Sequence, residues 1–259
     1  MPPLPSLMRM RLIRMIAIAV AAMAATVPAR ADFKVKMPDA EFGELALETV
    51  GNYGRSGNPL TDNEQSFVHE IEYGFTNFWR SGIEFETGRD PGPGKHFKFQ
   101  QITWENWFVF GERGQYWIDP ALFVEYGHPT LTGVPDEIKF GPLLRKEIGP
   151  TVNTVNLFLT KEIGQFAGGG RMSFNYAWET RISTGGLIEP GFQAYGEPGP
   201  IGHFSHVSEQ DHRVGPQLFV AIHDFGPGTL KMNGGILFGL TPAAPRETLR
   251  WQAEYEIHF

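Results

Sequence analysis

The last twelve residues of the chain, 248–259, alternate apolar and polar side chains without a break. One face of this segment would carry Leu249, Trp251, Ala253, Tyr255, Ile257 and Phe259. The other face would carry Arg250, Gln252, Glu254, Glu256 and His258. A period of two residues predicts a β-strand, because successive side chains of a strand point to opposite sides. The chain therefore ends in a strand that needs an apolar environment on one side and a polar one on the other.

The N-terminus has the pattern of a secretory signal peptide. Arg9, Arg11 and Arg14 precede the apolar run 15–25, and Ala29 and Ala31 with Arg30 between them form a small-residue cleavage pattern. The apolar run is shorter than the roughly 20 residues that a spanning helix needs. We therefore predict that residues 1–31 are a cleaved signal peptide and that the protein is exported. The sequence has no cysteine, which excludes disulfides and an acylated N-terminal cysteine.

The charge of the chain argues against nucleic acid as a partner. The chain has 22 Lys and Arg and 29 Asp and Glu. Four of the arginines lie in residues 1–31, so 18 basic residues face 29 acidic ones in the remainder, a net charge of −11. A nucleic-acid-binding domain normally has the opposite balance. Of the remainder, we predict residues 32–40 to be a short periplasmic segment and residues 41–259 to form one domain.

Alternation bounded by turn residues predicts an all-β chain of about twelve strands, with 10 or 14 as the boundary alternatives. The expected strands span residues 41–50, 66–75, 78–87, 96–110, 116–126, 137–147, 151–163, 171–183, 187–196, 213–223, 230–241 and 248–259. The connections alternate between long and tight, with tight turns at 76–77, 111–114, 148–150, 184–186 and 224–229. Antiparallel up-and-down transmembrane barrels show this asymmetry, with short periplasmic turns and longer external loops. A soluble β-sandwich gives the same period-two signal and is the alternative.

Prolines within four expected strands weigh against this interpretation, since each removes a donor from the hydrogen-bonded ladder. These are Pro120, Pro142, Pro190 and Pro216. We expect β-bulges or local breaks near the barrel rims at these positions.

The signal peptide, the amphipathic strands and the terminal Phe259 together resemble Gram-negative outer-membrane β-barrel proteins over essentially the whole mature length. The resemblance implies an outer-membrane location, contact with membrane lipids and lipopolysaccharide, and recognition of the C-terminal strand by the barrel-assembly machinery. A weaker resemblance is to the outer-membrane, transporter-like family associated with the MetA pathway of phenol degradation. It rests on segments 137–149, 215–219 and 234–239. That family brings no catalytic residues.

If the apolar faces meet lipid, the charged residues between them point into the lumen. The lumen-facing candidates are Glu70, Glu72, Glu84, Glu86, Glu105, Asp119, Glu125, Lys139, Arg145, Glu179, Arg181, Arg250, Glu254 and Glu256. Acids outnumber bases among them, which suits a narrow channel for small solutes that prefers cations. The alternative is a closed structural or sensing barrel whose interior is filled by salt bridges. The sequence does not indicate which solute would pass or how many copies associate.

Three histidines, His203, His206 and His212, fall in one expected external loop with Ser205. These residue types could form a metal site or the Ser/His pair of an outer-membrane lipid hydrolase, which is the enzyme alternative. No local motif supports either, so a solvated loop is favoured. We predict no catalysis, no cofactor and no metal ion.

Overall fold

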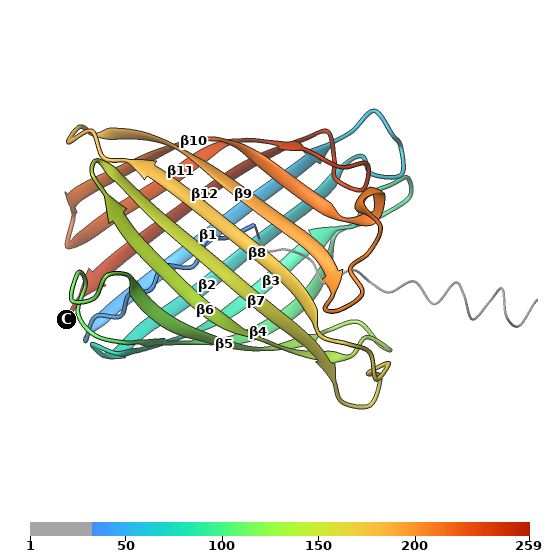
Figure 1. The fold of residues 1–259 in the computed structure, drawn as a ribbon, viewed down its shortest axis with the longest axis horizontal. Helices are drawn as coiled ribbons and strands as arrows, with labels where there is room; N and C mark the ends of the chain where they lie inside the picture. The colour runs from blue at the N-terminus through green and yellow to red at the C-terminus, as the bar shows by residue number, and fades with distance from the viewer. Residues whose placement is uncertain (1–32) are drawn as a thin grey trace, which may run out of the picture. The chain divides into compact units, whose positions relative to one another are not determined.

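The computed structural model describes residues 33–259, which form a closed antiparallel barrel of twelve strands (Figure 1). The predicted signal peptide lies outside the described residues. The strands are β1 (Glu44–Arg55), β2 (Glu64–Thr76), β3 (Trp79–Arg89), β4 (Lys98–Val109), β5 (Asp119–Pro129), β6 (Asp136–Ile148), β7 (Thr151–Ile163), β8 (Ser173–Ile182), β9 (Ile188–Pro200), β10 (Asp211–Phe225), β11 (Gly228–Gly239) and β12 (Glu247–His258). A short 3₁₀ helix, η1 (Val207–Glu209), lies between β9 and β10. The predicted fold class and strand number are confirmed.

Every strand pairs with its neighbours in sequence, and β1 closes the barrel against β12. Glu48 of β1 lies opposite Glu254 on one side and Glu70 on the other. The amphipathic C-terminal segment thus forms one side of the closing seam. Because the pairing joins residues of the same face, each strand places one set of alternating residues inside the barrel and the other outside.

One of the predicted tight turns is a longer loop. The turn expected at 111–114 is longer, covering residues 110–118 between β4 and β5, so the predicted strand 116–126 begins instead at Asp119. Gly111 and Gly114 have positive φ angles of 88° and 78° there. The Asp119 side chain accepts a hydrogen bond from the Gly114 amide at 2.6 Å. Two glycines in left-handed conformations fold this segment into a local loop instead of continuing the strand.

The bulges expected at the prolines are absent, but the pairing has local breaks at Pro142 between β6 and β7 and at Pro216 between β10 and β11. These breaks lie within the strands and not near the rims. The register shifts occur elsewhere, for example between Gly74 and Thr76. Three of the four prolines adjoin a glycine, as in Gly141–Pro142. A Cβ added at Gly141 would lie 1.8 Å from the Leu157 carbonyl oxygen. The neighbouring strand β7 therefore approaches closely at the glycine. Pro142 has no N–H to donate to β7, but the β6–β7 register is the same on both sides of it.

The outer face is apolar and the interior is charged. Large apolar side chains exposed on the outside include Leu47, Ile71, Ile83, Trp104, Leu122, Phe192, Leu218, Ile236, Leu249 and Trp251. The interior also holds an apolar cluster of Trp107, Ala121, Phe123, Leu143 and Phe158. Within residues 33–259, no helix is long and apolar enough to cross a membrane.

Candidate functional site

The candidate site lies in the barrel interior, where the segment Phe33–Met37, here called the strap, passes within the ring of strands (Figure 1). The strap belongs to residues 32–40, which we predicted to be periplasmic. Phe33, Lys34, Val35 and Lys36 are all buried. Their partners come from β1, β2, β3, β4, β7, β9, β10 and β12, so the strap is surrounded by the barrel wall.

Two barrel side chains hold the backbone of the strap. The Lys36 amide donates to Asn156 Oδ1 at 2.7 Å, and Asn156 Nδ2 donates to the Lys36 carbonyl at 2.9 Å. Arg250 Nε donates to the Phe33 carbonyl at 2.5 Å. Asn156 and Arg250 are themselves fully buried, so these hydrogen bonds replace those that the strap would otherwise make with water.

Lys34 points into a pocket of carboxylates on β1 and β2. Its Nζ contacts Glu70 and lies 2.9 Å from Glu48 and 3.3 Å from Glu72. Burial alone would lower the pKa of Lys34, but the three carboxylates hold it well above its ordinary value. Lys34 therefore stays an ammonium ion inside the barrel.

Lys36 occupies a second pocket, formed by β3, β4 and β5. Its Nζ contacts Glu105 and lies 3.7 Å from Glu84. The centroids of the Trp107 and Phe123 rings lie 5.5 and 5.0 Å from the same Nζ atom. The pocket thus combines carboxylates with aromatic rings, and both attract a cation.

The alternate side chains of the strap are apolar and pack on the opposite wall. The Phe33 ring meets Tyr195 edge to face with centroids 5.4 Å apart. The Arg213 guanidinium lies 4.2 Å from the centroid of the Phe33 ring. Val35 joins the same cluster with Ala177 and Leu237. The strap therefore lies between the carboxylates of β1–β4, here called the acidic wall, and a mixed apolar and polar surface on β8–β12.

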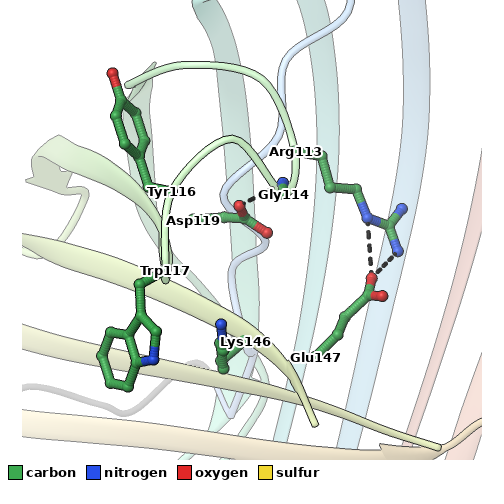
Figure 2. A pocket seen from close by; sticks show the side chains of 7 residues that line it. All are labelled: Arg113, Gly114, Tyr116, Trp117, Asp119, Lys146 and Glu147. Atoms are coloured by element: carbon green, nitrogen blue, oxygen red, sulfur yellow. Dashed lines mark hydrogen bonds and ion pairs between the residues drawn. The ribbon is translucent and has the colours of Figure 1, made fainter. Parts of the chain in front are cut away.

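Cavities remain at the end of the barrel where β4 turns into β5. One, of about 390 Å³, lies beside residues 38–41 of the chain and is lined in part by Glu44, Arg145, Lys231 and Glu256. Another, of about 400 Å³, is lined by Arg113, Gly114, Tyr116, Trp117, Asp119, Lys146 and Glu147 (Figure 2). In it Arg113 pairs with Glu147 at 2.7 Å. Both cavities lie at the rim, and neither is lined by residues of the two lysine pockets.

The predicted lumen residues lie at inward positions of their strands. Buried among them are Glu70, Glu72, Glu84, Glu105, Glu125, Arg145, Glu179, Arg250 and Glu256. Half-buried are Glu86, Asp119, Lys139, Arg181 and Glu254. The structure brings Glu70, Glu72, Glu84 and Glu105 together around the strap. It pairs others in separate bridges, such as Lys139 with Glu125 at 2.9 Å.

Sequence reasoning missed three interior cations, Lys34, Lys36 and Arg213. Arg213 sits at the start of a predicted strand and binds Glu64 and Asp211 near one rim. Lys34 and Lys36 lie outside every predicted strand. The available signal was the alternation of Phe33, Lys34, Val35 and Lys36. This alternating segment is much shorter than a membrane-spanning strand, so it was not predicted as one.

The three candidate histidines do not form one site. His206 Nδ1 lies 2.7 Å from Ser208 Oγ, while His212 contacts Tyr176 and Gln210. Within residues 33–259, the side chains grouped closely enough for a metal ion do not include these histidines. Two such groups are Glu48/Glu70/Glu72 and Glu70/Glu84/Glu105, and in both the lysines of the strap supply the cation.

The strand pairing defines the class of protein, a closed twelve-stranded antiparallel barrel with a charged interior. No family model matches the chain and no curated protein matches it, so the resemblance to the MetA-pathway family stays a prediction.

Several solved barrels share part of the architecture. CdiB from Escherichia coli is 8% identical over 84% of this chain, with a TM-score of 0.43, and the chain spans 63% of its length. The Acinetobacter baumannii outer membrane protein Omp33 is 9% identical over 86% of this chain and 100% of its own, with a TM-score of 0.42. An anion-selective porin from Comamonas acidovorans is 11% identical over 83% of this chain and 98% of its own, with a TM-score of 0.38. At these values the matches assign no function.

Proposed function

We propose that the protein is an outer-membrane β-barrel that passes small solutes and whose lumen is closed at rest by the strap. The single observation that supports a membrane location is that apolar side chains face outward and charged side chains face inward, the opposite of a soluble protein. Leu218 and Leu249 on the outer face are 55% and 53% exposed, whereas Glu105 and Arg250 inside are fully buried. A soluble barrel or sandwich would place the apolar face inside.

The closure of the lumen in the absence of solute is inferred from the side chains that fill it. Small barrels are filled by their own side chains, whereas larger ones leave an aqueous channel. Here the wall alone does not complete the filling, because a separate segment supplies Phe33, Val35 and two ammonium groups. A filling element that is not part of the wall can leave without breaking the strand ladder. We therefore infer that solutes pass along the acidic wall when the strap is displaced.

We also infer that lipids and lipopolysaccharide surround the barrel and that the assembly machinery recognises its C-terminal strand. The support is that β12 presents Leu249 and Trp251 outward and is followed by the exposed Phe259. We assign no catalytic role to any residue.

Planar-bilayer recording tests the proposal. The mature chain is compared with a Lys34→Gln/Lys36→Gln variant and with Lys95→Gln, which changes an exposed loop lysine. We expect rare openings from the mature chain and from the control. The double variant should give discrete steps with a cation-selective reversal potential, because its acidic wall loses two counter-charges. An anion-selective pore would contradict an acidic path.

The second candidate function is a closed structural or sensing barrel. The buried apolar cluster around Trp107 and Phe123, with which the wall itself fills the interior beside Lys36, favours it. Electrical silence from all three proteins, each shown by spectroscopy and gel mobility to be folded, would favour this candidate over a channel.

A further inference from the structure

We propose that the two pockets that hold Lys34 and Lys36 are solute-binding sites, and that the solute is a small organic cation with primary ammonium groups. The strap is then a tethered occupant of the sites that the solute uses. This inference rests on the proposed function, because a solute reaches these pockets only through the lumen.

The first step of the argument is charge. Glu48, Glu70, Glu72, Glu84 and Glu105 are buried side by side on the acidic wall. Buried carboxylates must be paired, because an unpaired buried charge is costly. Departure of the strap removes two ammonium ions from this wall at once. Arg80 still pairs with Glu72 at 3.1 Å, but Glu70 and Glu105 lose their lysines, and another cation must enter for these two to stay ionised.

The second step concerns the chemistry of that cation. In the pocket of Lys36, two aromatic rings lie about as close to the ammonium as a cation–π contact requires. Hard metal ions such as Ca²⁺ and Mg²⁺ take six or more oxygen ligands and gain little from aromatic faces. An alkylammonium ion uses both features, donating its N–H groups to Glu105 and placing its charge over Trp107 and Phe123. The side chain of Lys36 is itself an alkylammonium group, and it makes both kinds of contact in this pocket.

The third step concerns the number of charges. Glu70 belongs to both carboxylate groups, within each of which the ligand oxygens lie within 4.8 Å of one another. The two pockets are therefore contiguous, and the strap fills both from one short stretch of backbone. A linear diamine is the simplest free molecule that offers two ammonium groups on one chain.

The fourth step is competition. A ligand that binds the open state and not the strap-bound state shifts the equilibrium toward the open state. Besides its lysines, the strap is held by non-covalent contacts with the wall, among them those with Asn156, Arg250, Tyr195 and Arg213, and by no strand pairing. The solute of the channel would thus open it by occupying the two pockets in place of Lys34 and Lys36.

Chemical rescue tests the pocket itself. Lys36→Ala removes the ammonium and most of its stem, and n-butylamine supplies both as a free molecule. We expect n-butylammonium at about ten times its Kd to raise the thermal midpoint of Lys36→Ala by about 3–6 °C. Butan-1-ol should have no such effect, and neither should the amine on Lys95→Ala or on Lys36→Ala/Glu105→Gln. Absence of rescue, or equal stabilisation by calcium, would overturn the assignment.

A second measurement needs no change at the lysines, so it holds even if Lys36→Ala does not fold. Because the chain has no cysteine, Val35→Cys gives a single thiol on the buried strap. We expect 1,5-diaminopentane to raise its rate of labelling by a charged thiol reagent several-fold, with 1,5-pentanediol and matched sodium chloride inactive. Leu60→Cys, on an exposed loop, controls for the reagent. An unchanged rate would overturn competition between diamine and strap.

These results separate the inference from the proposed function. Rescue without conductance would keep the ammonium pocket and remove the channel. Conductance in the bilayer without rescue or accelerated labelling would keep the channel and remove the ammonium solute.

Discussion

Replacing Lys36 by methionine and Glu105 by glutamine, singly and together, measures how strongly the strap is bound to the acidic wall. The two side chains touch and are 1% and 0% exposed. Breaking a buried pair by removing one partner costs about 3–5 kcal/mol, because the other charge stays buried without compensation. Replacing both by neutral groups avoids that penalty. We therefore expect the double variant to lose less than the sum of the singles, with a coupling of about 3 kcal/mol, the upper end for contacting residues.

Urea unfolding in detergent micelles, followed by tryptophan fluorescence, gives the four free energies of the cycle. The matched control is the same cycle on Arg113 and Glu147, which pair at 2.7 Å but are 63% and 52% exposed. An exposed pair should couple by only about 0.2–1 kcal/mol. If the cycle on Lys36 and Glu105 gave a coupling no larger than this control, the strap would not be anchored by buried charge, and our account of the site would fail.

Two further predictions test the barrel. Gly215→Ala places a Cβ 1.8 Å from the Ile236 carbonyl oxygen and should block formation of the heat-resistant folded band on gels, whereas Gly57→Ala, with nothing within 4 Å, should fold normally. Leu218→Arg puts a charge on the outer face in the middle of β10 and should lower the free energy of unfolding in lipid vesicles by about 2–4 kcal/mol, while Leu60→Arg in a loop should leave it unchanged; equal effects would contradict the proposed lipid contact of β10.

The strands were predictable because each one spans enough residues for a period of two to stand out. Thr151–Ile163 was predicted at its observed bounds, and the remaining strands differ at their ends. The start of β5 was harder, since Tyr116 and Trp117 continue the aromatic character of a strand while they belong to a loop that two glycines turn. Such turns depend on individual φ angles, which hydrophobic pattern does not report.

The prolines show a second limit of pattern reading. A proline alone argues for a bulge, but Gly141–Pro142 keeps its register because the neighbouring Leu157 carbonyl packs where a side chain would stand. This compensation is a property of two strands together. It becomes visible only once the pairing register is known.

The strap was missed because the prediction considered charge only within strands. The inward-facing candidates contained more acids than bases, and that excess was interpreted as the mark of a cation-preferring pore. An excess of buried carboxylate requires cations but does not say whether they are mobile ions or side chains from another part of the chain. In this structure the cations are Lys34 and Lys36, which bring two positive charges to the wall where the acids gather. With the strap in place, the buried carboxylates would be neutralised by Lys34 and Lys36, and with the strap displaced, by cations of the solute. Selectivity for a solute would then arise from how well its cations replace the two lysines.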